Sequence, residues 1–117
     1  MIIPILRIFD YEKAKEFYLD FLGLQLDWTH QFEDNMPLYV QVSSEGDVLH
    51  LSEHHGDASP GSSIRIQKKS LKQYQKKLLE KNYPHMKPGI EETPWGTLEV
   101  TVVDPFSNRI IFYEDKK

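Results

Sequence analysis

Alternating apolar and polar positions are clearest in the C-terminal third of the chain. Residues 98–103 and 109–113 each show the period of two that is typical of a β-strand with two different faces. Asp104-Pro105 lies between them and indicates a turn. We therefore expect a β-hairpin here. It is preceded by the short loop Thr93-Pro-Trp-Gly96, whose proline and glycine hold the tryptophan outside regular structure.

A second pattern, with apolar residues three and four positions apart, predicts two helices. The first follows Asp10, a favourable N-cap, and ends at Gly23, a typical C-cap residue. The second lies in a lysine-rich stretch, residues 68–81, whose charges we expect on a solvated face. The apolar positions of the two helices correspond at an offset of 57 residues: Ala14, Phe17, Phe21 and Leu22 in the first, and Leu71, Tyr74, Leu78 and Leu79 in the second.

Shorter alternating stretches predict the remaining strands, at residues 2–8, 25–32, 38–43, 47–52, 64–66 and 85–91. Ser44-Glu45-Gly46 connects two of them as a hairpin, because the connection is short and contains glycine. The stretch 85–91 is the weakest, since Pro88 and Gly89 interrupt it.

The order of these elements repeats. Each half reads strand, helix and three strands, and residues 48–53 correspond to 109–114 at an offset of 61. The sequence therefore predicts an α+β fold: a single domain, 1–117, built from two βαβββ modules, about 1–57 and 58–117, that form a curved mixed sheet. Neither module could bury its sheet without its helix and its sister module.

Superposing the two halves sorts the strand residues by face. We expect the core face to carry Leu6, Ile8, Leu49, Leu51, Ile64, Ile66, Ile110 and Phe112. The opposite face then carries Ile3, Ile5, Arg7, Tyr39, Gln41, His50, Ser52, Ser63, Arg65, Glu99, Thr101, Ile111 and Tyr113. This mixture of aromatic, polar and apolar side chains is typical of a ligand pocket.

Composition narrows the classes of partner. The chain has 14 basic and 18 acidic residues, a net charge of -4 and no long basic run, which disfavours nucleic acid and favours a cationic ligand. The absence of cysteine excludes disulfides, thiolate metal sites and a cysteine nucleophile. No apolar run reaches membrane-spanning length, so we expect a soluble, cytoplasmic protein with no membrane partner.

Several motifs together resemble one known superfamily. They are Leu6-Arg-Ile-Phe-Asp10, Ala14-x-x-Phe-Tyr18, Leu22-Gly-Leu24, the run His50–Asp57, Thr93-Pro-Trp-Gly96 and Asp104-Pro-x-x-Asn-Arg109. The chain resembles the vicinal oxygen chelate superfamily (glyoxalase, bleomycin resistance and dioxygenase proteins), and within it the bleomycin resistance proteins. The resemblance implies the glyoxalase/bleomycin resistance fold, usually a homodimer with ligand crevices at the subunit interface, and a role in antibiotic resistance.

The superfamily's enzymes hold a divalent metal at four positions that correspond here to Ile3, His50, Ser63 and Ile111. Only His50 is a strong ligand, whereas metal catalysis needs about three. We therefore expect no metal, no cofactor and no catalytic residue, and the resemblance favours metal-independent binding and sequestration of bleomycin-like glycopeptide antibiotics over an enzyme. The alternative is a metal-dependent lyase, isomerase or dioxygenase that acts on a small molecule and recruits its metal through His50 and unrecognised partners. His54, His55 and Asp57 keep this alternative open, and a module that binds another small molecule is a third possibility.

The expected ligand of the favoured function is a flat, aromatic, cationic antibiotic. Aromatic side chains would stack on it and carboxylates at the rim would attract its charge. The candidate ligand-binding residues are Trp95, Phe32, Trp28, Tyr39, His50, Ser63, Glu99, Glu33 and Asp34, with Glu53 as a further rim carboxylate. The simpler alternatives are that Trp95 caps the core, that Trp28 is part of it, and that the acids are ordinary surface charges.

Overall fold

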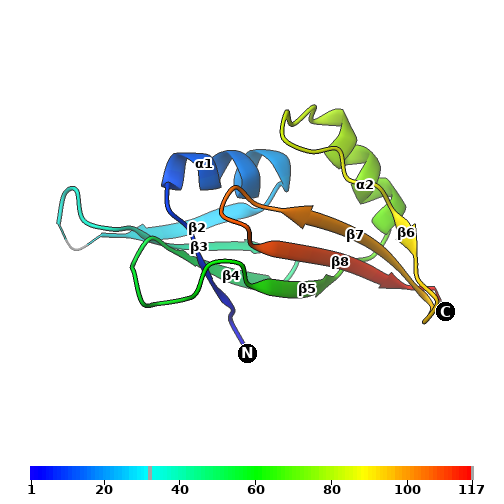
Figure 1. The fold of residues 1–117 in the computed structure, drawn as a ribbon, viewed down its shortest axis with the longest axis horizontal. Coiled ribbons are helices and arrows are strands. Elements are labelled where there is room, and N and C mark those ends of the chain that lie inside the picture. Colours follow the sequence, from blue (N-terminus) through cyan, green and yellow to red (C-terminus); the bar gives the residue numbers. More distant parts are fainter. Residues whose placement is uncertain (32, 117) are drawn as a thin grey trace. The chain divides into compact units, whose positions relative to one another are not determined.

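The structure is a computed structural model that describes residues 1–31 and 33–116 (Figure 1). The helices and strands are β1 (Ile5–Arg7), α1 (Tyr11–Lys15), η1 (Glu16–Phe21), β2 (Gln25–His30), β3 (Tyr39–Ser44), β4 (Asp47–Ser52), β5 (Ser63–Gln67), α2 (Leu71–Glu80), β6 (Glu91–Glu92), β7 (Thr97–Val103) and β8 (Arg109–Asp115). The chain divides into two compact units. Unit 1 contains Met1–Ser62 and Asp104–Asn108, and unit 2 contains Ser63–Val103 and the residues from Arg109 onward.

Each unit contains one mixed four-stranded sheet with the same topology. In unit 1 the order is β1-β4-β3-β2, with β1 parallel to β4 and the other neighbours antiparallel. In unit 2 the order is β5-β8-β7-β6, with β5 parallel to β8 and the other neighbours antiparallel. The predicted α+β fold, with its repeated βαβββ topology, is confirmed.

The first helix begins where the sequence predicts. Asp10 has an extended backbone and its carboxylate accepts hydrogen bonds from the amides of Glu12 and Lys13 at 2.9 and 3.3 Å. The predicted helix up to Gly23 is confirmed in extent, but Glu16–Phe21 forms a π-helix and not an α-helix, closed by a 2.9 Å hydrogen bond from the Leu22 amide to the Phe17 carbonyl. The side chains of Phe17, Tyr18 and Phe21 in this segment, and that of Leu22 after it, are buried in the core.

A two-residue turn joins β3 to β4. Glu45 and Gly46 both have positive φ, 52° and 89°, as a type I′ hairpin turn requires. The predicted hairpin is confirmed with strands one residue closer together than expected. Because the turn fixes the strand register, Gln41 pairs with His50, and Tyr39 with Ser52.

The Asp-Pro-Phe-Ser-Asn segment, 104–108, forms a buried polar core in unit 1. The Asp104 carboxylate accepts hydrogen bonds from the Tyr18 hydroxyl at 2.6 Å and from two amides of its own turn at 2.8 and 2.9 Å. The Asn108 side-chain amide donates to the Arg7 carbonyl at 2.8 Å and to the Asp104 carboxylate at 2.9 Å. Among the described residues, every buried side-chain nitrogen and oxygen atom has a hydrogen-bond partner, so the burial of Asp104 and Asn108 carries no large desolvation penalty.

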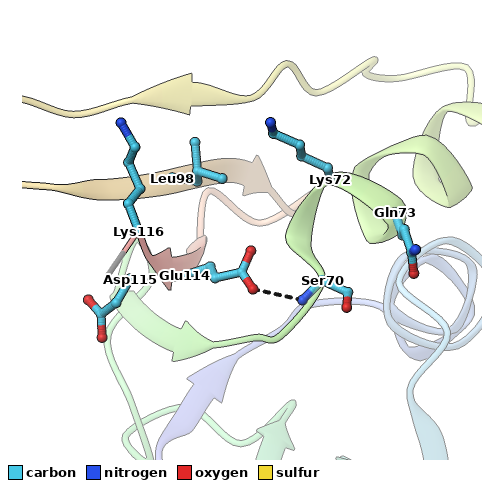
Figure 2. A pocket seen from close by; sticks show the side chains of 7 residues that line it. All are labelled: Ser70, Lys72, Gln73, Leu98, Glu114, Asp115 and Lys116. Atoms are coloured by element: carbon cyan, nitrogen blue, oxygen red, sulfur yellow. Dashed lines mark hydrogen bonds between the residues drawn. The ribbon is translucent and has the colours of Figure 1, made fainter.

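A glutamate at the end of the parallel pair caps the helix of each unit. In unit 2 the Glu114 carboxylate accepts from the Ser70 amide at 2.9 Å (Figure 2) and from the Leu71 amide at 3.2 Å. In unit 1 Glu53, at the corresponding position, accepts from the Tyr11 amide at 3.0 Å and from the Leu38 amide at 2.8 Å. The repeat therefore extends to the caps, and Glu53 connects two backbone segments of its own unit.

Four strand residues differ in burial from what the predicted faces imply. Arg7 and Ser52 lie on the same sheet face as Tyr39, as expected, but both are buried, with 9% and 0% of their surface exposed. The Arg7 guanidinium donates to the Ile8 carbonyl at 2.7 Å and lies over the Phe9 ring, while the Ser52 hydroxyl donates to Asp57 at 2.7 Å. Ile64 and Ile66, expected in the core, are only half-buried on the edge strand β5.

The predicted strand at 85–91 is reduced to Glu91–Glu92, which pair with Glu99 and Leu98. Proline lacks the amide that a longer ladder would need, which explains the shortening. None of the helices in the described part of the chain has the length and apolar character needed to cross a bilayer.

Candidate functional site

One face of the unit 1 sheet gathers aromatic and polar side chains. Trp28, Gln41 and His50 occupy directly paired positions on β2, β3 and β4, and Tyr39 lies two residues from Gln41 on the same face. Asp27 joins them through its hydrogen bonds. We call these five residues the aromatic face.

The three rings of the aromatic face contact one another. Trp28 and Tyr39 lie nearly parallel, with centroids 6.1 Å apart and an interplanar angle of 14°. The His50 ring meets both of them edge-on, at 5.5 Å from Trp28 and 5.1 Å from Tyr39. The rings support one another in a fixed orientation, and 43% of the Trp28 surface stays exposed. An exposed, rigid indole is well suited to stacking on a flat ligand.

A chain of hydrogen bonds holds the polar groups of this face. The His50 imidazole contacts the Tyr39 hydroxyl through Nδ1 at 2.7 Å and the Gln41 carbonyl through Nε2 at 2.9 Å. The Gln41 amide nitrogen donates to the Asp27 carboxylate at 3.1 Å, and the Ser43 hydroxyl donates to the same carboxylate at 3.0 Å. Burial lowers the pKa of His50 below its ordinary value and raises the pKa of the Tyr39 hydroxyl. Both shifts favour the uncharged forms of these side chains.

A β-bulge decides which side chains reach this face. The register of β2 against β3 shifts between Leu26 and Trp28, so that Asp27 is an extra residue. Strict alternation would place Leu26 and Trp28 on the same face. With the bulge, Leu26 pairs with the buried Val42, whereas Trp28 pairs with Gln41. Sequence alternation alone could not predict that Asp27 joins this face, because the position of a bulge depends on the partner strand.

Other predicted site residues of unit 1 lie beyond β2. Glu33 and Asp34 are exposed in the turn that connects β2 to β3. Phe32 lies outside the described residues. Glu53 accepts hydrogen bonds from two amides, as described above.

Unit 2 carries a second cluster, which lies around Glu99. The Arg65 guanidinium donates to the Glu99 carboxylate at 2.9 Å and lies 4.6 Å from the centroid of the Tyr113 ring. The hydrogen bond from Arg65 is the main cause that holds the pKa of the Glu99 carboxyl below its ordinary value, and hydrogen bonds from Thr97 and Trp95 act in the same direction. The Glu99 carboxylate is thus already paired with an arginine.

Trp95 is the more exposed of the two tryptophans. Its side chain is 69% exposed in the turn before β7, where the Thr93 and Thr97 hydroxyls bond each other at 2.7 Å and close the loop. Ser63, at the start of β5, pairs with Arg109 at the other end of the sheet from Glu99. The structure thus brings Trp95 and Glu99 together, and leaves Ser63 apart from them.

The side chains at the superfamily's four metal-binding positions do not fit a metal ion. The four corresponding positions hold Ile3, His50, Ser63 and Ile111, and both ring nitrogens of His50 already have hydrogen-bond partners. Within residues 1–31 and 33–116, His, Cys, Asp and Glu side chains do not gather in groups of three that could hold a metal ion.

A shallow hollow of about 460 Å³ lies beside the N-terminus of α2 (Figure 2). The Glu114 carboxylate already occupies the helix terminus there, and Lys72, Asp115 and Lys116 line the rim. Lining of this kind, with charged, solvated side chains and one leucine, is not typical of a small-molecule pocket.

Two units of βαβββ topology, each with one mixed four-stranded sheet, define the class of fold to which this chain belongs. A sequence model of one family, described as "Glyoxalase superfamily protein", matches residues 1–117. The chain therefore belongs to the glyoxalase superfamily, and the resemblance seen in its motifs is confirmed. Comparison with curated proteins gives no match.

Solved structures share the fold at low sequence identity. A putative glyoxalase family protein from Bacillus anthracis superposes with a TM-score of 0.77 at 16% identity, covering 99% of this chain and 94% of that one. A bleomycin-binding protein complexed with bleomycin gives 0.73 at 16%, covering 98% of both chains. TnmS3, an antibiotic-binding protein from Streptomyces sp. CB03234, gives 0.72 at 21%, covering 97% and 93%.

Proposed function

We propose that this protein binds and sequesters a flat, cationic, aromatic small molecule of the bleomycin-like class without changing it chemically. The observation that carries the proposal is the aromatic face, where Trp28 and Tyr39 lie nearly parallel and His50 supports both. A flat ligand that stacks on the exposed indole would bury apolar surface without having to order a flexible side chain.

Electrostatics favour a cation. The Asp27 carboxylate lies on the aromatic face, Glu33 and Asp34 are exposed in the turn after β2, and the chain carries a net charge of -4. A negative potential of this kind raises the rate at which a cationic ligand reaches the surface.

The comparisons support binding without fixing the ligand. Two proteins of the same fold are described as bleomycin-binding and antibiotic-binding, and the others include general glyoxalase-family proteins. A homodimer, a cytoplasmic location and a role in antibiotic resistance belong to the same proposal. The cysteine-free sequence suits a reducing compartment.

The metal-dependent alternative finds less support in the residues present. His50 is the one imidazole at the superfamily's metal positions, and Gln41 and Tyr39 already use its two nitrogens. Metal analysis of chelator-free, untagged protein tests this point. Stoichiometric metal would contradict the proposal and favour the enzyme.

Calorimetric titration of chelator-treated protein with metal-free bleomycin tests the proposal directly. We expect saturable binding near one drug per chain. We expect Trp28→Ala to weaken binding by about tenfold or more, because losing a stacked indole removes both its stacking and its buried apolar area. Leu26→Ala, an exposed apolar residue of the same strand that pairs with the core residue Val42, is the matched control and should retain the affinity.

The Trp95→Ala variant tests whether the ligand binds at the aromatic face or at the cluster around Glu99. Each tryptophan variant leaves a single tryptophan, whose fluorescence reports whether the ligand approaches that position. Quenching of Trp28 in the Trp95→Ala variant would support the aromatic face. No binding to the wild-type protein at high drug concentration would overturn the drug-binding proposal.

A further inference from the structure

The hydrogen bonds of the aromatic face have a direction, and Asp27 sets it. An ionised carboxylate can only accept hydrogen bonds. Asp27 accepts from the Gln41 side chain at 3.1 Å and from the Ser43 hydroxyl at 3.0 Å. The atom of Gln41 that faces Asp27 must therefore be the amide nitrogen, and the Gln41 carbonyl oxygen must face His50, 2.9 Å from Nε2.

The direction continues through the histidine. A carbonyl oxygen can only accept, so Nε2 of His50 must carry a proton. In the neutral imidazole Nδ1 is then an acceptor, and the Tyr39 hydroxyl, 2.7 Å away, donates to it. Burial lowers the pKa of His50, which keeps this neutral form populated at neutral pH.

The Tyr39 hydroxyl therefore uses its proton in the hydrogen bond to His50. Within residues 1–31 and 33–116 no group donates to the Tyr39 oxygen, so its lone pairs are available to an outside donor. The Tyr39 side chain is half-buried and lies nearly parallel to the exposed Trp28 ring. A ligand stacked on the indole meets an acceptor at this position.

We propose that Asp27 is a positioning residue that sets the hydrogen-bond polarity of the aromatic face. Through Gln41 and His50 it makes Tyr39 an acceptor, so that this face selects flat aromatic ligands carrying an N–H or O–H donor over ligands with acceptors alone. The claim about ligands rests on the proposed function, whereas the direction of the hydrogen bonds is a property of the free protein.

The first test is the tautomer of His50 in the free protein, read from long-range proton–nitrogen NMR spectra of the imidazoles. The wild-type protein should show the form protonated at Nε2. In Asp27→Asn the new side-chain amide can donate to the Gln41 carbonyl oxygen. The Gln41 amide group can then rotate and turn its nitrogen toward His50. The form protonated at Nδ1 should then become populated.

Asp47→Asn is the matched control, because it removes one exposed carboxylate from β4 of the same sheet and should leave the His50 tautomer unchanged. A wild-type His50 protonated at Nδ1 would overturn the inference and leave the proposed function standing. An unchanged tautomer in Asp27→Asn would do the same.

The second test compares two probes of one shape: 6-aminoquinoline, whose amino group donates, and 6-methoxyquinoline, whose ether oxygen only accepts. NMR titration should show the amino compound binding about fivefold more tightly, the effect of roughly one net hydrogen bond. The ratio should persist in Asp47→Asn and fall toward one in Asp27→Asn.

The outcomes distinguish a failure of donor selection from a failure of ligand binding at the aromatic face. Equal binding of both probes to the wild-type protein would overturn donor selection while supporting a stacking surface. If neither probe shifts the resonances of Trp28 or Tyr39, both donor selection and ligand binding at this face are overturned.

Discussion

At the scale of single residues, the aromatic face depends on contacts that no local pattern encodes. Tyr39 and His50 follow from strand alternation together with the β3–β4 turn, and both were predicted to share a face. Asp27 was not, because its position results from a bulge against β3. Glu99 was expected to attract a cation, and the structure pairs its carboxylate with Arg65.

His50 makes folding stability depend on pH. Burial lowers its pKa in the folded protein, so the unfolded chain takes up the proton more readily. This contribution destabilises the folded protein as pH falls through about 6.5, the ordinary histidine pKa, and is absent at higher pH. In the described part of the chain, His50 bonds Tyr39 and Gln41, contacts the Trp28 ring and pairs with Ile5 in the sheet. Asp27 bonds Gln41, and the charge of Asp57 raises the pKa of Tyr39.

Urea denaturation between pH 5 and 8 measures this effect. The free energy of unfolding of the wild-type protein should decrease more steeply toward pH 5 than that of His50→Gln. Parallel curves for the two proteins would show that His50 titrates alike in the folded and unfolded chains.

At the scale of elements, the sequence predicted most boundaries and missed two features. Asp10, Gly23 and the Glu45-Gly46 turn act within a few residues of themselves, and all three were correctly placed. The π-helix and the shortened β6 were not predicted. The π-helix carries the buried side chains Phe17, Tyr18 and Phe21, whereas the shortening of β6 has a local cause, since Pro88 and Gly89 interrupt the predicted strand.

The cap of α2 provides a test at this scale. Ser70 has no capping hydrogen bond from its own side chain, and Glu114 from β8 accepts the helix amides instead. Glu114→Gln should lower the free energy of unfolding by about 1 kcal/mol, the usual value of an N-cap. Glu80→Gln, which removes an exposed carboxylate from the last residue of the same helix, should change it by less than about 0.5 kcal/mol. Equal effects of the two variants in urea denaturation would contradict the capping role.

At the scale of the whole molecule, residues far apart in sequence meet in the polar core of unit 1. The Tyr18 hydroxyl and the Asp104 carboxylate are 2.6 Å apart although 86 positions separate them. Burial first, and then the neighbouring Asp104 carboxylate, raise the pKa of Tyr18 well above its ordinary value. The motif Asp104-Pro-x-x-Asn-Arg109 was noticed as a family signature, and the structure gives its aspartate and asparagine this structural role.

Tyr18→Phe removes one hydroxyl and leaves the shape of the core unchanged. The Asp104 carboxylate would lose a buried hydrogen bond, so we expect the free energy of unfolding to fall by about 1.5–3 kcal/mol, the range for hydrogen bonds to charged groups. Tyr11→Phe, at a half-buried position at the start of α1, is the control and should cost less. A thermal or urea denaturation series that finds no difference between the two would refute the importance of this contact.

The sequence by itself determined the repeat, the order of helices and strands, the hairpin turn, the first N-cap and the family. Periodicity, turn chemistry and capping are properties of neighbouring residues, and the sequence states them directly. Tertiary structure alone decided that Trp28 leaves the core face, that Asp27 joins it on the aromatic face, and that Glu53 and Glu114 cap helices. Each of these depends on the register between strands or on a carboxylate meeting amides from another element, and such pairings form only when the chain has folded.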